Sequence, residues 1–356
     1  MRDERLAAYA ELLVGRCARV EAGWQVALFA APAAEPLVDE VLRLLARRGA
    51  YALRRTTWPY EMAWLREAPE ELVDALPPIE LHTVREIDAV IAIEAPRNTR
   101  EASDVPPERL AAVRRARRPF LDRISAHEIP WVSCQYPTPA LAQDAGMSVE
   151  AFEDFLLGAC LLDWDALGEE MRGYAARLDE AEEVRIVGAG TDLTLSIAGR
   201  RAIVSDGRRN MPDGEFFYAP VEDSAEGTIT FGEFPSEQGG RVIRGIRLRF
   251  EAGRVVEADA ETEAAYLHEL LDTDEGARRL GELGIGCNPG ITRYLMNTLF
   301  DEKMVGTVHL ALGNSYTAAG GTNESVIHWD IVKDLRAGGR LYADGELVQE
   351  DGRWLV

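Results

Sequence analysis

The chain has few cysteines, and their spacing forms no motif. The 356 residues contain four, Cys17, Cys134, Cys160 and Cys287, and no two make a C-x-x-C pair. A disulfide-stapled secreted fold and a cysteine-held metal site therefore have no support. The sequence also lacks an apolar run long enough to span a bilayer, and its opening M-R-D-E-R-L is not that of a signal peptide. We expect a soluble cytoplasmic protein with reduced thiols.

Positive charge is also in short supply. Lys and Arg together number 39 against 61 Asp and Glu, a formal net charge of -22. Such a surface repels nucleic acids and anionic membranes, so neither is an expected partner. The hydrophobic fraction of 47% is ample for buried cores, which argues against a disordered chain. At this length, two domains are expected rather than one.

The first half of the chain alternates between strand-like and helical patterns. Short apolar strands are expected at 26–31, 50–55, 89–93 and 129–135, with helices expected at 6–20, 36–49 and 108–117. This alternation predicts a layered, mostly parallel α/β domain. No G-x-G-x-x-G follows the first strand, so dinucleotide binding has no support.

The second half has a different pattern. Helical periodicity continues from Ser148 to about Glu183, and from Val184 strand-like segments separated by tight turns predominate. The Gly188-Ala189-Gly190 segment is followed by another strand rather than a helix, so it indicates a hairpin turn and not a phosphate loop. We predict an α/β N-terminal domain over 1–180 and an α+β, mainly antiparallel C-terminal domain over 181–356.

Histidine is scarce too, and two of the five histidines lie between His309 and Asp330. His328 and Asp330 belong to S-V-I-H-W-D-I-V, whose composition is typical of a strand, so both side chains should project from the same face. His309 lies in a second strand-like run, T-V-H-L-A-L, and could approach them from a neighbouring strand. Tyr316 lies in the polar loop between the two. By itself, an H-x-D pair also fits ordinary hydrogen-bonded residues.

Two glutamates stand out by their surroundings. Glu215 follows a Pro-Asp-Gly turn and begins an aromatic, strand-like run. Glu282 is flanked by glycines at 281, 284 and 286, which allow close approach of the backbone. Each could equally be a solvent-facing glutamate at a strand edge or in a loop.

Taken together, the candidate residues supply three carboxylates and two imidazoles. They are Glu215, Glu282, His309, His328 and Asp330. This donor set suits zinc, manganese, cobalt or iron. A bridging carboxylate could hold two divalent ions with an acidified water between them, and Tyr316 would assist as a proton donor or electrophile.

Several ordered stretches make the sequence similar to the thermophilic metalloaminopeptidase family, almost from end to end. They are Y-P-T-P-A-L-A-Q-D-A-G-M-S (136–148), G-T-D-L-T-L (190–195), N-M-P-D-G-E-F-F-Y-A-P (210–220), G-A-R-R-L-G-E-L-G-I-G-C-N (276–288), H-L-A-L-G-N-S-Y (309–316) and N-E-S-V-I-H-W-D (323–330). The loop from Tyr316 to His328 is shorter than in these peptidases, which affects the mouth of the site or a dimer contact.

The resemblance implies a two-metal exopeptidase that removes residues from free peptide N-termini. The resemblance also implies a set of metal ligands and an active-site tyrosine, Tyr316. It implies that Glu282 is the carboxylate that bridges the metals and takes part in catalysis. The implied ligands are Glu215, Glu282, His309, His328 and Asp330, and the implied metals are zinc, cobalt, manganese or magnesium. A homodimer that encloses a cavity is implied as well.

Two alternatives remain. The 2,5-dihydroxypyridine dioxygenases resemble these peptidases, and His309, His328 and Asp330 alone would make a facial triad for a mononuclear Fe(II) ring-cleaving enzyme. That reading leaves Glu215 and Glu282 without a role. A binding protein that has lost turnover is the other alternative, although no member of the ligand set is missing.

Overall fold

The structure is a computed structural model that describes residues 3–56, 61–125 and 128–355. The chain forms two units, one made of 1–161 with 207–212 and the other of 162–206 with 213–356. The sequence-based boundary at residue 180 lies at the far end of helix α10 (Trp164–Asp179), which belongs to the second unit. Contacts with the second unit explain this: the Tyr218 hydroxyl lies 3.0 Å from the Ala175 carbonyl and 2.9 Å from Asp179 Oδ1, and shares its single proton between these acceptors.

The first unit is built on a parallel sheet, as the alternating pattern predicted. Its strand order is β2-β1-β3-β4-β8, and every pairing is parallel. The strands are β1 (Gln25–Ala30), β2 (Tyr51–Arg55), β3 (Ala89–Glu94), β4 (Trp131–Gln135) and β8 (Asn210–Met211). The last strand comes from far along the sequence, which accounts for the return of the chain to this unit.

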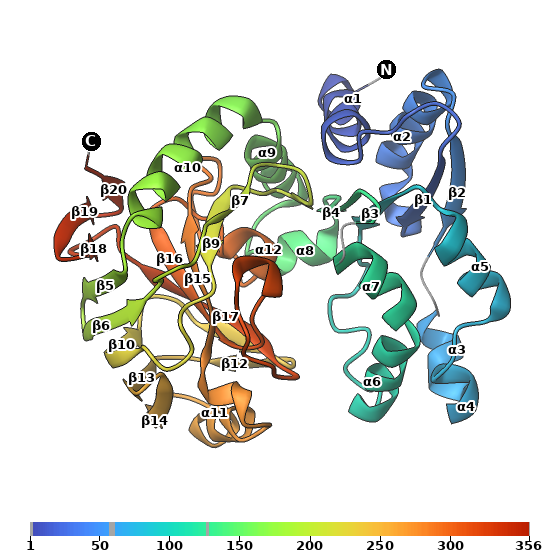
Figure 1. The fold of residues 1–356 in the computed structure, drawn as a ribbon. Helices are drawn as coiled ribbons and strands as arrows, with labels where there is room; N and C mark the ends of the chain where they lie inside the picture. Colours follow the sequence, from blue (N-terminus) through green and yellow to red (C-terminus); the bar gives the residue numbers. More distant parts are fainter. Residues whose placement is uncertain (1–2, 57–60, 126–127, 356) are drawn as a thin grey trace. The chain divides into compact units, whose positions relative to one another are not determined.

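Helices cover both faces of this sheet (Figure 1). Val84, Ile87 and Phe120 pack from one side on Ala27 and Val90 of the sheet. The helices are α1 (Glu4–Glu11) with a π-helical continuation (Leu12–Cys17), α2 (Glu35–Arg47), α3 (Met62–Glu67), α4 (Glu70–Val73), α5 (Pro78–Glu86), α6 (Pro107–Ala116), α7 (Arg118–Ser125), α8 (Pro139–Asp144) and α9 (Val149–Cys160). Ser148 caps α9 as expected, accepting from the Ala151 N–H at 3.2 Å.

The second unit contains two larger antiparallel sheets and a small hairpin. The eight-stranded sheet has the order β14-β13-β10-β6-β5-β18-β19-β20, and the five-stranded sheet has the order β17-β16-β15-β9-β7. The first comprises β5 (Glu183–Gly188), β6 (Thr191–Ser196), β10 (Glu226–Phe231), β13 (Ile246–Glu251), β14 (Arg254–Asp259), β18 (Arg340–Ala343), β19 (Glu346–Glu350) and β20 (Arg353–Trp354). The second comprises β7 (Ile203–Ser205), β9 (Glu215–Tyr218), β15 (Leu280–Gly286), β16 (Thr307–Gly313) and β17 (His328–Asp334).

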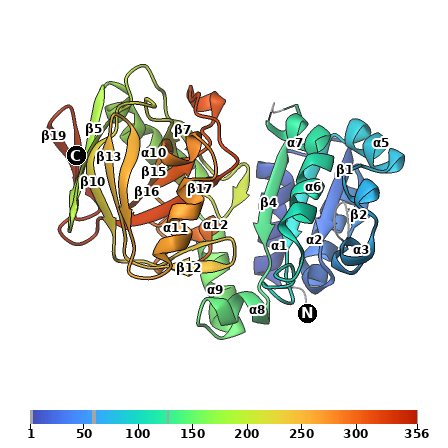
Figure 2. The ribbon, with the colours of Figure 1, turned by 90° about the horizontal axis from the view of Figure 1, so that it is seen from below.

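The two larger sheets lie as layers, which Figure 2 shows. Lys333 of β17 donates to the carbonyls of Thr230, at 2.9 Å, and Ala189, at 3.3 Å, at the ends of strands of the eight-stranded sheet. Gly188-Ala189-Gly190 is the predicted hairpin turn, between β5 and β6. The run 241–250 divides into β12 (Arg241–Ile243) and β13, because Gly245 turns the chain with a φ of 61°.

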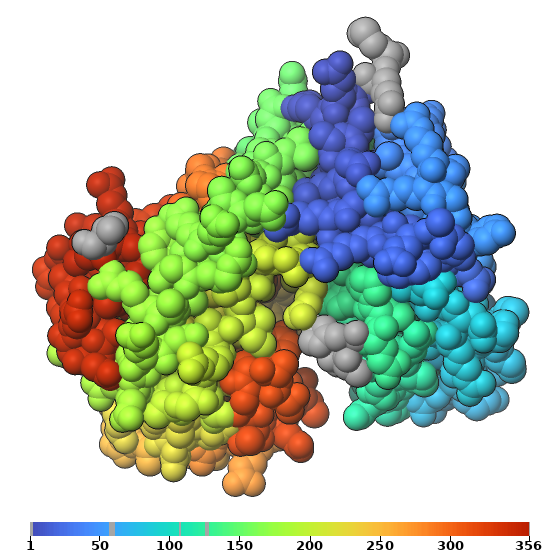
Figure 3. Space-filling model, turned by 45° about the horizontal axis from the view of Figure 1, so that its top comes forward, coloured from blue at the N-terminus to red at the C-terminus, as the bar shows by residue number. Residues whose placement is uncertain are grey.

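This unit also contains the helices α11 (Ala264–Leu271) and α12 (Thr298–Asp301), and the hairpin pairs β12 with β11 (Ser236–Gln238). Helix α10 lies beside the C-terminal strands, where the rings of Tyr174 and Trp354 stack 4.5 Å apart. Figure 3 shows the light-green surface of this helix next to the red surface of those strands. Of the helices in the described ranges, none combines the length and apolar character that crossing a membrane requires.

Candidate metal centre

One face of the five-stranded sheet carries all five candidate ligands. Glu282 pairs with Ala311, which pairs with Asp330, so the two carboxylates stand in one row across β15, β16 and β17. The next rows place Gly284 opposite His309, and Gly286 opposite Glu215. Because side chains alternate along a strand, His328 and Asp330 share this face, as the H-x-D spacing predicted.

Small residues on this face make room for the ligands. A Cβ on Gly284 would overlap the imidazole of His309, so only glycine lets that ring lie across the neighbouring strand. A Cβ on Gly281 or Gly286 would overlap backbone carbonyls of Asn314 or Met304. The expectation that these glycines permit close approach is therefore confirmed. They also explain why a strand with so little side-chain bulk is buried along its whole length.

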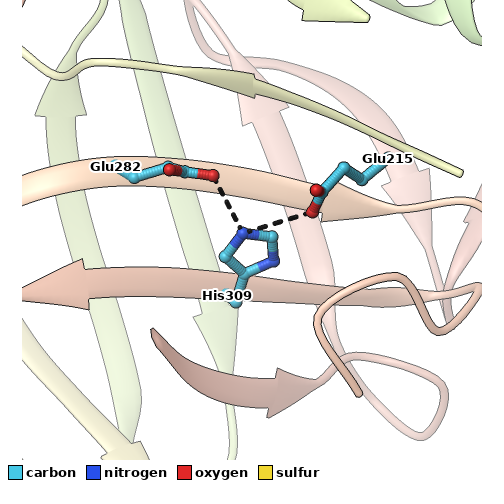
Figure 4. A group of neighbouring side chains, drawn as sticks. All are labelled: Glu215, Glu282 and His309. Atoms are coloured by element: carbon cyan, nitrogen blue, oxygen red, sulfur yellow. Dashed lines mark hydrogen bonds and ion pairs between the residues drawn. The ribbon is translucent and has the colours of Figure 1, made fainter. Parts of the chain in front are cut away.

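His309 lies between two carboxylates, which Figure 4 shows. Its Nε2 lies 3.1 Å from Glu282 Oε1 and 3.5 Å from Glu215 Oε2. All three side chains are buried. The Nδ1 of His309 and the Oε2 of Glu215 have no hydrogen-bond partner in the described chain.

Glu282 also faces the second histidine, with its other oxygen. Its Oε2 lies 3.6 Å from His328 Nε2, which is 3.5 Å from Asp330 Oδ1. The carbonyl of Asn314 accepts from His328 Nδ1 at 2.7 Å. A carbonyl can only accept, so in the neutral ring the lone pair is on Nε2, directed into the cluster.

The donor atoms fall into groups of the size that a metal ion needs. Glu215, Glu282 and His309 form one, and Glu282, His328 and Asp330 form another, with the atoms of each within 4.8 Å of one another. Glu282 belongs to both. The mixture of carboxylate oxygens and imidazole nitrogens fits divalent transition metals, and the unpartnered buried oxygens of Glu215 and Asp330 fit cation ligands.

The pKa values show how much these groups depend on one another. Burial alone would lower the pKa of His309 and His328, but the neighbouring carboxylates outweigh it and raise each to about 10. Burial raises the pKa of Glu215 to about 8 and also raises that of Glu282. Burial would raise the pKa of Asp330 as well, yet the contact with His328 holds it below its usual value. Protons therefore occupy the cluster in the metal-free protein.

A family model described as thermophilic metalloprotease (M29) matches residues 2–354. The chain belongs to the thermophilic metalloprotease (M29) family. Aminopeptidase T of Thermus aquaticus is 31% identical over 71% of this chain and 73% of its own length. Aminopeptidase 2 of Geobacillus stearothermophilus is 27% identical over 99% of this chain and 98% of its own length.

Among solved structures, wild-type AmpT from Thermus thermophilus matches with a TM-score of 0.86 and 27% identity, covering 99% of both chains. Membership of a metalloprotease family implies use of a divalent metal, in agreement with the donor groups. It also confirms the family resemblance read from the ordered motifs.

Tyr316, the tyrosine expected in the site of an M29 protein, lies at the edge of the cluster. Its ring centroid is 5.2 Å from that of His328 and 5.5 Å from that of Phe217. Partial burial and then the nearby carboxylates of Glu282 and Asp330 keep its pKa above the usual value. The hydroxyl therefore stays protonated at neutral pH and can donate.

Two residues beside the cluster, Glu302 and Lys303, were not predicted from the sequence. Glu302 forms a third donor group with His309 and Asp330. The ammonium of the fully buried Lys303 contacts Glu302 and lies 3.5 Å from Glu215 Oε1. In the sequence, they appear only as an acidic residue followed by a basic one, shortly before the strand of His309. Such a pattern is common on protein surfaces. Neither residue type is unusual enough to be singled out without the fold.

Proposed function

We propose that this M29 protein is a metal-dependent aminopeptidase that holds two divalent ions through Glu215, Glu282, His309, His328 and Asp330. The observation that carries the proposal is the position of Glu282. Its two oxygens face different histidines, at 3.1 and 3.6 Å, which suits a carboxylate shared between two ions. The relatives named aminopeptidase T and aminopeptidase 2 support the reaction type.

The two ions would supply the chemistry of acidifying a bound water and polarising the scissile carbonyl. The protein contributes the arrangement. The Asn314 carbonyl fixes the ring orientation of His328, and Gly284 leaves the space in which His309 turns toward Glu282. Tyr316 provides a neutral hydroxyl at the edge of the cluster, suited to hydrogen-bond the developing oxyanion.

The substrate's free amine would bind one of the metal ions or a nearby carboxylate. A small cavity next to the cluster is lined by residues that include the acidic Asp330, Glu302, Asp301 and Glu237, and by Tyr294. In our proposal this acidic wall holds the substrate's α-ammonium. Peptides are the substrates, the metals are zinc, cobalt, manganese or magnesium, and the enzyme works as a cytoplasmic homodimer.

The dioxygenase alternative is disfavoured by the contents of the cluster. A facial triad of His309, His328 and Asp330 needs one ion and open positions around it. Glu215 and Glu282 are buried within the same group of side chains, in contact with His309. The family match names a metalloprotease.

The test is hydrolysis of leucine p-nitroanilide and of a short leucyl peptide by chelator-stripped protein, before and after addition of cobalt, zinc or manganese. Metal-restored release of free leucine is expected, with none from the same peptide acetylated at its N-terminus. Equal cleavage of both peptides would contradict the exopeptidase assignment. No cleavage with any metal would contradict the function as a whole and lead to oxygen-uptake assays with Fe(II) and dihydroxypyridines.

A further inference from the structure

Lys303 is a fully buried lysine that contacts the candidate metal centre without belonging to its ligand set. It lies between α12 and β16, and its backbone is fixed at both ends. Its N–H donates to the Phe300 carbonyl at 3.0 Å, and its carbonyl accepts from the Asn288 N–H at 2.8 Å. The ammonium is therefore held in place beside the carboxylates it contacts.

The two carboxylate oxygens of Glu215 have different neighbours, and only one of them faces Lys303. The ammonium lies 3.5 Å from Oε1, whereas Oε2 lies 3.5 Å from His309 Nε2 and has no hydrogen-bond partner in the described chain. One oxygen thus faces a fixed positive charge, and the other faces the metal position. Glu215 is presented as a one-oxygen ligand.

The two donor groups that share Glu282 consequently differ in charge environment. The group of Glu215, Glu282 and His309 has an ammonium in contact with one of its carboxylates. Within the described ranges, Glu282, His328 and Asp330 form no ion pair with a lysine or arginine, and Lys303 acts on Asp330 only at longer range. A fixed positive charge repels an incoming cation, and more strongly in a buried site than in water.

We propose that Lys303 is a positioning residue that makes the two metal positions unequal. The position formed by Glu282, His328 and Asp330 fills first, and the position that includes Glu215 fills second and more weakly. The same ammonium compensates Glu215 and Glu302 while the second ion is absent, so the metal-free cluster is already assembled. This inference rests on the two-metal centre proposed above.

The test is a calorimetric titration of chelator-stripped protein with Co²⁺, alongside the visible absorption of bound cobalt. The wild-type protein should show two steps, and His328→Ala should remove the tighter one. Lys303→Met keeps the side-chain bulk and removes the charge. It should tighten the second step by at least about tenfold, because a unit charge beside the cation is gone, and should lower the Tm of the stripped protein.

Lys333→Met is the matched control. Lys333 is equally buried but belongs to the opposite face of the sheet, where it donates to Glu233 and to the carbonyls of Ala189 and Thr230. This variant should also lower the Tm yet leave both cobalt steps unchanged. Lys303→Arg, which keeps the charge, should retain the wild-type separation between the steps.

A second variant works in the opposite direction and does not require loss of the lysine. Glu302→Gln leaves the ammonium without its nearest partner and should weaken the second step. If Lys303→Met binds cobalt with unchanged or weaker second-step affinity, the role given to Lys303 is overturned while the metal centre stands. If the wild-type protein takes up no metal, the centre and this inference fall together.

Discussion

The residue on which the proposed chemistry depends is Glu282, and its position could not be derived from the sequence. The flanking glycines indicated close packing, yet a loop glutamate was equally compatible with them. The structure shows why glycine is needed: the ring of His309 occupies the space that a Cβ at Gly284 would take. Glu282 then meets both histidines, one with each oxygen.

Replacing Glu282 by Gln should remove the shared ligand. The amide cannot carry the negative charge that two cations require, so metal bound per chain should fall, and activity should drop by more than about a hundredfold, beyond the loss typical of outer-shell partners. Metal content by elemental analysis and leucine p-nitroanilide hydrolysis check this. Glu180→Gln, an exposed change at the end of α10, is the control. A fully metallated, active Glu282→Gln protein would refute the assignment.

Gly284→Ala tests, with the addition of a single methyl group, whether Gly284 is needed to leave room for the His309 ring. The added methyl must displace the His309 ring, so we expect metal binding to weaken and stability to fall by about 1–3 kcal/mol, as in other overpacked sites. Gly173→Ala in α10, where nothing lies within 4 Å of the new Cβ, should instead stabilise the protein by about 0.5–1 kcal/mol. Urea unfolding and cobalt titration of both variants make the comparison. Wild-type metal affinity in Gly284→Ala would contradict the argument.

The sequence indicated candidate ligands whose positions follow a periodic rule, and it missed neighbours of the cluster whose positions do not. His328 and Asp330 could be assigned to one face because a strand repeats every two residues. Glu302 and Lys303 lie outside a strand, after α12, where no period relates position to direction. Their approach to the cluster depends on how the chain returns from α12 to β16, which is a property of the fold.

At the scale of elements, the loop that carries Tyr316 is held by side-chain contacts from elsewhere in the second unit. Glu222 accepts from the N–H of Thr322 at 2.7 Å and from its hydroxyl at 2.8 Å, while Arg200 pairs with its other oxygen at 3.0 Å. Further along, Asp274 accepts from Ser325 and from the Val326 N–H. The loop is short but anchored at two points, so Tyr316 is presented by a constrained segment.

Glu222→Gln should therefore act on Tyr316 without touching the ligands. An amide has a single acceptor oxygen and cannot serve both Thr322 and Arg200, so the loop should loosen and kcat should fall about tenfold or more through misplacement of the hydroxyl. Metal content should stay at the wild-type level. Tyr316→Phe removes the hydroxyl and should give the largest fall in kcat that its misplacement can cause. Adding Glu222→Gln to Tyr316→Phe should therefore lower kcat little further. A further large loss in the double variant would argue that Glu222 acts by another route.

Strand β15 could not be predicted from its local sequence. The other strands of the site are rich in β-branched or aromatic residues, and they were expected from that composition. The segment L-G-E-L-G-I-G has three glycines, which disfavour a strand on local grounds. It lies in the middle of the five-stranded sheet, between β16 and β9, where Gly284 leaves room for the ring of His309 on the neighbouring strand.

At the scale of the molecule, the parallel first half and antiparallel second half were predictable from pattern alone. The interleaving of the two units was not. Residues 207–212 return to the first unit because Asn210 and Met211 pair with β4, and a two-residue strand leaves no periodic signal. Glu215 begins β9 only a few residues later, so the same short segment ends one sheet and supplies a candidate metal ligand to the other.

The protonation of the cluster should make the metal-free and metal-loaded proteins respond oppositely to pH. In the metal-free fold, His309 and His328 have pKa values of about 10, against about 6.5 when unfolded. Groups with a raised folded pKa add stability below the unfolded value, and that stability is lost as pH rises toward the folded value. Chelator-stripped protein should thus lose stability steadily from pH 6.5 to 9.

Metal binding requires the same histidines to be deprotonated, so the stabilisation by added Zn²⁺ or Co²⁺ should grow over this pH range. Binding to the folded state alone stabilises it by mass action, and protons compete less as pH rises. Urea unfolding from pH 6.5 to 9, with chelator or with excess metal, should give two curves that diverge. Parallel curves would show that the histidines do not exchange protons for metal, and would count against ligation by His309 and His328.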